Sequence, residues 1–319
     1  MRRVVIVGFD DAELLDIACP ADVFDSATRW GADPPYQVEL TSLGGRPIVT
    51  TSGITLAAGA VERVTGRLDT VVVSGGLGHR HAAEDARLLT HLRRLAGQSR
   101  RIASVCTGAT LLAAAGLLDG RRATTHWMWA DELSASYPAV TVDPAPLFVA
   151  DGNVHTSAGV TSALDLALAL VEDDHGPALA RLVARTLVTY LQRPGNQAQV
   201  SVHVSAPMPD DRTVRAVCDH VTAHLDTHLD AATLARIAGV SPRHLTRLFQ
   251  THLGTTPARH VRAVRTETAA QLLISTRLPL GAIARRCGFG TTETLRQAFN
   301  DHYAATPSAY RRTARRPGG

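Results

Sequence analysis

A repeated stretch near the C-terminus is the most informative part of this sequence. Its first copy reads Leu234-Ala235-Arg236-Ile237-Ala238-Gly239-Val240-Ser241, and its second reads Ile283-Ala284-Arg285-Arg286-Cys287-Gly288-Phe289-Gly290. Further matches follow each copy: Leu245, Phe249, His252 and Thr256-Pro257 recur as Leu295, Phe299, His302 and Thr306-Pro307. Each copy indicates a short helix, a glycine turn and a second helix opened by a capping residue. This is the pattern of a helix-turn-helix, whose second helix can enter the major groove of DNA.

The residues around the repeat predict an all-helical region. A first helix is expected over 213–225, and Asp230 is expected to cap the next through its carboxylate. Ser241 followed by proline places a cap and then a favoured first helical residue at the start of the first reading helix. A long connecting helix is expected from Thr256-Pro257 to about Ser275. Thr291 or Thr292 should cap the second reading helix.

Polar side chains lie on the outward faces of both reading helices. Arginine can contact guanine through two hydrogen bonds, glutamine can contact adenine, and glutamate can accept from cytosine. Two reading helices joined by one helix could enter successive major-groove segments roughly 34 Å apart. The alternative for each side chain is an ordinary solvated helix position. The predicted DNA-binding residues are Arg243, His244, Thr246, Arg247, Thr292, Glu293, Arg296 and Gln297.

Charge is distributed unevenly along the chain. All 33 basic residues are arginine, and residues 212–319 hold 16 of them against 6 acidic residues. Residues 1–211 hold the other 17 against 23 acidic residues. The formal net charge is therefore +10 in the C-terminal third and −6 in the remainder, in agreement with the total of +4. This asymmetry favours contact with a polyanion through the C-terminal third alone.

Residues 213–312 resemble the AraC/XylS-type DNA-binding domain. The resemblance is carried by the two helix-turn-helix units and by a late signature that runs from Ile283 through Cys287-Gly288-Phe289 to Phe299, Pro307 and Tyr310. Membership of that family implies a sequence-specific transcription regulator with double-stranded DNA as its partner. RNA polymerase would be a further partner of an activator.

The first 190 residues alternate strand-like and helix-like patterns. Strands are expected at 3–9, 36–43, 46–50, 70–74, 102–105 and 153–156, and helices at 12–29, 84–98 and 158–173. Apolar strands that alternate with helices indicate an α/β domain with a parallel sheet between helices, flavodoxin-like in class. The expected divisions are an α/β domain over 1–192, a linker over 193–211, an all-α domain over 212–313 and a basic tail over 314–319.

Cys106 lies at a predicted turn from strand to helix, in Ser104-Val105-Cys106-Thr107-Gly108-Ala109. Such a turn exposes a side chain near helix amides, which favour a thiolate. Asp16, after the first strand, could reach the same edge. Gly75 and Gly76 follow another strand and offer amides suited to an oxyanion.

Residues 3–190 resemble the ThiJ/PfpI group of the class I glutamine-amidotransferase-like fold. The motifs are Leu15-Asp16-Ile17-Ala18-Cys19-Pro20, the Gly-Gly pair, the cysteine turn and Thr124-Thr125-His126. Within the group the chain looks most like isocyanide hydratases. That likeness implies Cys106 as nucleophile, Asp16 as proton donor and acceptor, and Thr107 as a positioning hydroxyl. Near His155 no glutamate follows at the spacing of amidotransferases, which argues against glutamine hydrolysis.

Taken together, the chain resembles GlxA/FtrA-like members of the AraC family. That resemblance implies a homodimer whose first domain senses a small-molecule effector. The predicted ligand pocket comprises Asp16, Gly75, Gly76, Leu77, Cys106, Thr107 and His126. The alternatives are a cysteine hydratase or amidase joined to a DNA-binding domain, a redox sensor acting through Cys106, and a buried structural cysteine.

The remaining composition excludes several classes. The four cysteines (Cys19, Cys106, Cys218 and Cys287) are scattered, which argues against a disulfide framework or a zinc site. No cofactor or metal is expected. No apolar run approaches the roughly 20 residues needed to span a bilayer. The apolar run after Arg3 is short and soon followed by Asp10 and Asp11, so a first strand is expected rather than a secretion signal. A cytoplasmic location is the expectation.

Overall fold

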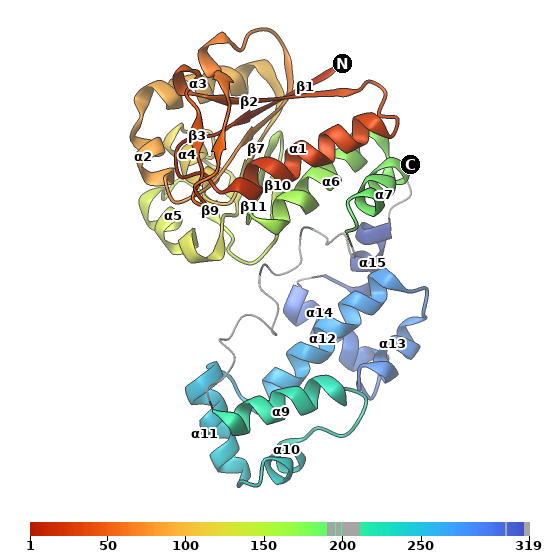
Figure 1. Cartoon of the computed structure of the whole chain (residues 1–319). Coiled ribbons are helices and arrows are strands. Elements are labelled where there is room, and N and C mark those ends of the chain that lie inside the picture. Colours follow the sequence, from red (N-terminus) through yellow and green to blue (C-terminus); the bar gives the residue numbers. More distant parts are fainter. Residues whose placement is uncertain (190–194, 196–198, 200–210, 304, 316–319) are drawn as a thin grey trace. The chain divides into compact units, whose positions relative to one another are not determined.

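The computed structural model describes residues 1–319 apart from 190–194, 196–198, 200–210, 304 and 316–319 (Figure 1). The chain divides into two compact units, Met1–Gln199 and Val200–Arg316. Each unit is described by itself. The expected linker over 193–211 falls mostly outside the described residues, as does the tail beyond Arg315.

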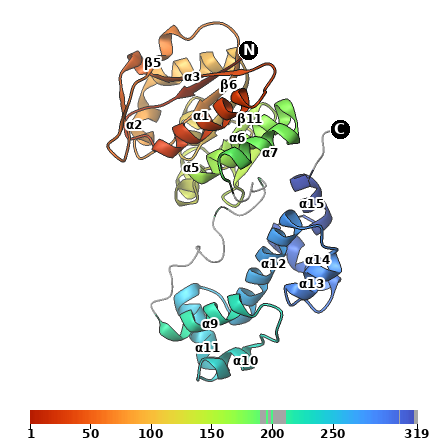
Figure 2. The ribbon, with the colours of Figure 1, turned by 45° about the vertical axis from the view of Figure 1, so that its right-hand side comes forward.

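A seven-stranded sheet forms the centre of the first unit, in the order β10-β11-β7-β6-β1-β2-β5. Figure 2 labels three of its strands, β5, β6 and β11. All neighbours pair in parallel except β10 and β11, which are antiparallel. The strands of this sheet are β1 (Arg2–Val7), β2 (Tyr36–Ser42), β5 (Gly59–Ala60), β6 (Leu68–Val73), β7 (Ser99–Val105), β10 (Phe148–Asp151) and β11 (Val154–Ser157). Two small two-stranded sheets are formed by β3 (Ile48–Val49) with β4 (Thr55–Leu56) and β8 (Arg122–Ala123) with β9 (Thr141–Val142).

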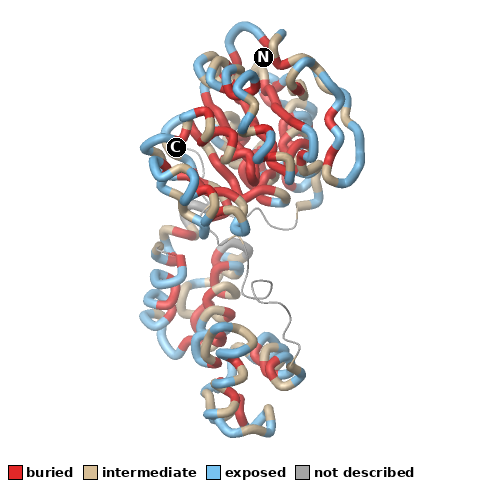
Figure 3. Tube along the Cα trace, turned by 90° about the vertical axis from the view of Figure 1, so that its left-hand side faces the viewer, coloured by how far each residue is buried: buried red, intermediate tan, exposed pale blue. Residues whose placement is uncertain are grey.

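Helices cover both faces of this sheet because its strands are apolar on both sides. In β1, Val5 and Val7 pack in the core beneath α3 and α4, whereas Val4 and Ile6 pack in the core beneath α1, α6 and α7. Figure 3 shows buried residues concentrated along these strands. The helices are α1 (Leu14–Arg29), α2 (His79–Glu84), α3 (Ala86–Gln98), α4 (Gly108–Ala114), α5 (Ala130–Ser136), α6 (Thr161–His175) and α7 (Pro177–Thr186), with 3-10 turns η1 (Leu43–Gly45), η2 (Val61–Arg63) and η3 (Trp127–Trp129). The predicted α/β class is confirmed.

Several expected elements differ in extent. The helix expected over 84–98 begins at Ala86, because Asp85 accepts from Arg87 N and Leu88 N and so starts a new helix after α2. The strand expected over 46–50 is reduced to the two residues of β3. The helix expected over 158–173 starts at Thr161, because Gly159 and Val160 both have positive φ.

The second unit is helical within its described residues. It contains α9 (Arg212–Ala223), α10 (Ala231–Ile237), α11 (Pro242–Leu253), α12 (Pro257–Ser275), α13 (Leu280–Arg286), α14 (Thr292–Tyr303) and α15 (Pro307–Arg315). Two separate cores form, one around Leu234, Leu245 and Phe249 and one around Ile283, Leu295 and Phe299. Helix α12 contributes to both cores, with Val261 and Val264 in the first and Ala269, Ala270 and Leu273 in the second. The two predicted helix-turn-helix units are therefore α10–α11 and α13–α14, joined by α12.

Capping in this unit follows the sequence closely. Asp230 Oδ1 accepts from Thr233 N at 2.7 Å, and Ser241 Oγ accepts from His244 N at 3.2 Å. Thr291, rather than Thr292, caps α14, since its Oγ1 accepts from Thr294 N at 3.1 Å. Helix α15 runs to Arg315, two residues past the expected boundary. No helix among the described residues of the chain is long and apolar enough to cross a membrane.

Candidate functional site

Cys106 lies at the carboxyl edge of the sheet, directly after β7. Its φ is +54°, a strained value for a residue with a side chain. Two hydrogen bonds hold its backbone: its N–H donates to Ser157 O at 2.9 Å, and its carbonyl accepts from Thr125 Oγ1 at 2.9 Å. Glycine is required at position 159 beside it, since a Cβ there would lie 2.1 Å from the Cys106 Cβ. The predicted strand-to-helix turn is confirmed.

Asp16 is fully buried against this cysteine. Its Oδ1 accepts from Val160 N at 2.7 Å, its Oδ2 accepts from Gly75 N at 3.1 Å, and it shares a hydrogen bond with the Cys106 thiol. Burial raises the pKa of Asp16 to about 7, although the two backbone donors act in the opposite direction. The acid and the cysteine therefore meet as expected, and burial favours the protonated form of the Asp16 carboxyl.

The expected thiolate is not supported. Burial, and then the nearby charge of Asp16, raise the pKa of the Cys106 thiol above its usual range. Contacts from the amide and hydroxyl of Thr107 lower it again, but they are outweighed. The prediction that helix amides favour a thiolate is wrong because the sulfur is buried beside an acid. Burial beside an acid therefore favours the thiol form of Cys106.

The glycine amides are already occupied by groups of the chain. Gly75 N donates to Asp16, and Gly76 N donates to Thr107 Oγ1 at 2.9 Å. The Thr107 hydroxyl donates in turn to Gly76 O at 2.9 Å. An oxyanion could be bound there only if these internal hydrogen bonds were broken. Thr107 thus joins the turn after β7 to the loop after β6.

Two members of the predicted pocket lie apart from this cluster. Leu77 is 71% exposed. His126 is partly buried, its Nδ1 accepts from Met128 N at 3.3 Å, and burial lowers its pKa. Its neighbour Thr125, which the sequence reasoning passed over, makes the direct contact with the cysteine backbone.

Gln199 is a further residue that the sequence reasoning missed. It falls within the expected linker, yet its side chain binds the loop after β8. Its Nε2 donates to Thr124 Oγ1 (3.1 Å), Thr125 O (2.8 Å) and Pro146 O (3.2 Å), and its Oε1 accepts from Trp127 N (2.9 Å). Its own N–H donates to Ala145 O at 2.9 Å. Gln199, at the end of the first unit, is therefore bound to Thr125, the residue whose hydroxyl contacts the Cys106 carbonyl.

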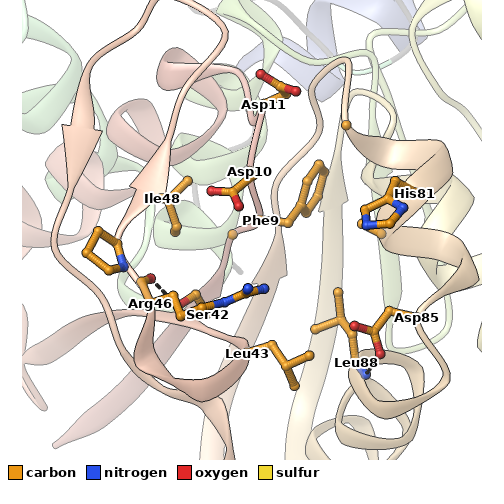
Figure 4. A pocket seen from close by; sticks show the side chains of 14 residues that line it. Phe9, Asp10, Asp11, Ser42, Leu43, Arg46, Ile48, His81, Asp85 and Leu88 are labelled. Atoms are coloured by element: carbon orange, nitrogen blue, oxygen red, sulfur yellow. Dashed lines mark hydrogen bonds between the residues drawn. The ribbon is translucent and has the colours of Figure 1, made fainter.

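A separate hollow of about 320 Å³ opens at the same sheet edge (Figure 4). None of the seven residues of the predicted ligand pocket lines it. Its walls come instead from the segments after β1 and β2 and from α2 and α3. The lining residues are Gly8, Phe9, Asp10, Asp11, Ser42, Leu43, Arg46, Pro47, Ile48, Gly78, His81, Ala82, Asp85 and Leu88.

The predicted DNA-binding side chains all lie on α11 and α14. Their exposure varies: Arg243, Arg247, Glu293, Arg296 and Gln297 are exposed, while His244, Thr246 and Thr292 are partly buried. The opposite faces of the two helices are buried in their separate cores.

Some of these side chains are held by neighbours along their own helix. Arg296 Nη1 lies 3.1 Å from Glu293 Oε2, and Arg247 Nη2 lies 3.2 Å from His244 Nδ1. Gln297 Nε2 donates to Asp301 Oδ1 at 2.7 Å. These local contacts orient the outward side chains without burying them.

Comparison with known proteins agrees with both halves of this description. Residues 2–173 match the DJ-1/PfpI family, and residues 234–313 match a helix-turn-helix domain. The chain belongs to the DJ-1/PfpI family. Its second unit carries the helix-turn-helix domain, at the positions where α10–α11 and α13–α14 lie.

Several relatives that match over more than four fifths of the chain are regulators. The chain is 34% identical over 283 residues to the HTH-type transcriptional regulator CdhR of Pseudomonas aeruginosa, covering 88% of this chain and 83% of that protein. It is 31% identical over 317 residues to the HTH-type transcriptional regulator GlxA of Rhizobium meliloti, covering 98% and 97%. A crystal structure of an AraC family transcriptional regulator from Pseudomonas putida superposes with a TM-score of 0.50 at 26% identity, over 59% of this chain and all of that one. This member of the DJ-1/PfpI family is thus a DNA-binding transcription regulator.

An enzyme also occurs among the relatives. The isonitrile hydratase of Pseudomonas putida is 37% identical over 175 residues, which is 55% of this chain and 73% of that protein. Activity in the first unit is left open by this likeness.

Proposed function

We propose that this regulator binds a specific operator as a dimer and that its first unit senses a small metabolite. One observation carries the proposal: two helices with exposed arginine and glutamine side chains are mounted on two separate cores and joined by α12. That arrangement suits two major-groove contacts on one duplex. A two-fold symmetric dimer would pair such modules on a site with two half-sites. For an activator, RNA polymerase would be a further partner.

The proposed DNA contacts are those of α11 and α14. Arg243, Arg247 and Arg296 would contact bases or phosphates, and Glu293 and Gln297 would contact base edges. His244, Thr246 and Thr292 are partly buried and would approach the groove or the backbone beside it. The excess of basic residues in this unit supports binding to a polyanion.

The first unit supports sensing better than turnover. Its cysteine is a buried thiol, and the neighbouring amides are taken by Asp16 and Thr107. A change at this sheet edge has a hydrogen-bonded path through Thr125 to Gln199, at the end of the first unit. An effector would act by binding the DNA-competent arrangement more or less tightly than the incompetent one.

Selection from a random duplex pool tests the proposal. The full chain is used at about 0.15 M salt, which suppresses non-specific phosphate binding. A recovered motif with two segments, duplicated by symmetry, is the expected result. A variant with Arg243, Arg247 and Arg296 changed to alanine should lose the motif. Recovery of the same motif by that variant would show that α11 and α14 are not the reading helices.

A second candidate function is an isocyanide hydratase-like activity in the first unit. The hydrogen bond between Asp16 and the Cys106 thiol favours it, because the acid is placed to take or return the thiol proton. Turnover of a simple isocyanide to its formamide, measured with the full chain and with Cys106→Ala, decides between the two. Turnover that is lost in the variant would establish the enzyme; equal background in both proteins would remove it.

A further inference from the structure

The hollow in Figure 4 combines an apolar floor with separated charges. Phe9, Ile48 and Leu88 supply apolar surface, and all three are buried. Three carboxylates (Asp10, Asp11 and Asp85) line the hollow together with one guanidinium, that of Arg46. A pocket of about 320 Å³ falls within the range that takes small molecules, roughly 300–1,000 Å³.

Arg46 is the informative member of this set. Figure 4 shows its guanidinium extended into the hollow from the segment between η1 and β3. Within the described residues it forms no ion pair and its side chain makes no hydrogen bond, although carboxylates line the same space. Its backbone, by contrast, is fixed, since Arg46 O accepts from the buried Ser42 hydroxyl. Opposite charges therefore face one hollow without touching.

Backbone N–H groups hold two of the carboxylates in place. Asp10 Oδ1 accepts from Val49 N at 3.2 Å, and Asp85 Oδ1 accepts the first amides of α3, Arg87 N at 2.9 Å and Leu88 N at 3.2 Å. Each carboxylate oxygen can accept more than one hydrogen bond, so both groups retain acceptor capacity. A ligand cation would find two fixed acidic groups.

We infer that this hollow is the effector site of the sensing unit and that it binds a small zwitterion. The ligand's carboxylate pairs with Arg46 through two parallel hydrogen bonds, its cationic nitrogen meets Asp10 and Asp85, and its aliphatic part covers Phe9, Ile48 and Leu88. A ligand with only one charge would leave the opposite charge unpaired. This inference rests on the proposed function, in that it names the class of effector and places it.

A short segment of the chain connects the hollow to the cysteine site. Asp10 and Asp11 line the hollow, and five residues later Asp16 contacts Cys106. The backbone between them packs on the loop after β6: Glu13 N donates to Gly75 O at 2.8 Å, and Gly78 N donates to Asp11 O at 3.3 Å. A Cβ at Gly78 would lie 2.1 Å from Asp10 O, so the two segments pack too closely for any side chain at position 78. Ligand binding would be transmitted to the Asp16–Cys106 pair through this contact.

Isothermal calorimetry on the full chain tests the site with defined probes. L-lysine and 6-aminohexanoate carry both charges, whereas hexanoate and hexylamine carry one each. We expect at least one zwitterion to bind with a Kd below about 1 mM, and both single-charge probes to bind at least about tenfold more weakly. Absence of binding by both zwitterions up to about 10 mM, or equal binding by hexanoate or hexylamine, overturns the inference.

Variants locate the binding. Arg46→Gln removes the charge from an exposed side chain and should weaken the zwitterion about tenfold or more, as should Asp10→Asn, which keeps the acceptor for Val49. Arg67→Gln, at an exposed arginine before β6, is the matched control and should bind as the native protein does. Unchanged binding in Arg46→Gln, or loss in Cys106→Ser instead, would place the ligand elsewhere. Operator selection does not depend on these probes, so failure of the site and failure of the regulator function are distinguishable.

Discussion

Replacement of Gln199 by alanine tests how firmly the end of the first unit is anchored. The side chain reaches three acceptors with two N–H hydrogens, and its oxygen accepts from Trp127 N at 2.9 Å. About three hydrogen bonds are therefore lost together. Each contributes a net 0.5–1.5 kcal/mol or so, which gives roughly 2–4 kcal/mol for the anchor. The carbonyls of Thr125 and Pro146 also lose a donor in a buried setting.

Hydrogen exchange at the Trp127 amide measures this directly, because that N–H is bonded to Gln199 alone among the contacts described. Where exchange follows local opening, a loss of 2–4 kcal/mol corresponds to acceleration by about 30-fold to 1,000-fold. Gln199→Glu should be no better than alanine, since it loses both donors and sets a negative charge against carbonyl oxygens. Gln37→Ala, at an exposed glutamine of β2, is the control. Equal exchange of the Trp127 amide in Gln199→Ala and in the native protein would refute the reasoning.

Four further predictions follow from the geometry. Because the folded-state pKa of Asp16 is about 7, above its unfolded value of about 3.9, the stability it contributes is fullest below pH 4 and is lost as pH rises through 7. Urea unfolding at pH 5 and pH 8 should therefore show a smaller loss for Asp16→Asn than for the native protein; parallel losses would contradict the buried-acid assignment. Asp16→Asn should also speed iodoacetamide alkylation of Cys106 at pH 8, because it removes a charge that raises the pKa of the thiol; slower alkylation would identify Asp16 as a base instead. Arg296→Ala should cost about 1–3 kcal/mol on the selected operator and relax one base position, whereas a uniform loss on all sequences would mean phosphate contact only. Finally, Gly288→Ala should lower the thermal stability of the chain more than Gly239→Ala: both glycines have φ near +70°, but only at 288 would a Cβ meet a backbone oxygen, Leu225 O, at 2.0 Å. Equal Tm values for the two variants would show that the positive φ, and not the contact with Leu225 O, determines the loss of thermal stability.

The periodic parts of the sequence predicted the fold well. Alternation of apolar strands and helices in the first unit, and the duplicated apolar faces of the second, are local signals that depend on the period of each element. The caps Asp230 and Ser241 could also be predicted from the sequence, because a capping side chain accepts from amides within three residues of itself. The turn at Cys106 was predicted from its neighbours and from family resemblance.

The sequence was misleading where environment decides chemistry. A cysteine at the start of a helix suggests a thiolate, but the burial of Cys106 and the proximity of Asp16 come from segments 90 residues apart, and they reverse the direction of the pKa shift. The amides of Gly75 and Gly76 looked available for an oxyanion until Asp16 and Thr107 were seen to occupy them. Val160 at φ +49° could not be expected, since a β-branched residue has no preference for that conformation.

The sequence by itself determined the two-domain organisation: an α/β unit of the DJ-1/PfpI type, and a basic helical unit with two reading helices. Those features arise from local periodicity, from charge and from a repeat, all of which are properties of the sequence and depend on no tertiary contact. Only the tertiary structure decided which groups meet at the sheet edge. It brought Thr125 to the cysteine backbone, Gln199 to Thr125, and Arg46 to a hollow lined by Asp10 and Asp85. Parallel strands bring their carboxyl ends together whatever their distance in sequence, so the composition of that edge is a property of the sheet order and not of any single segment.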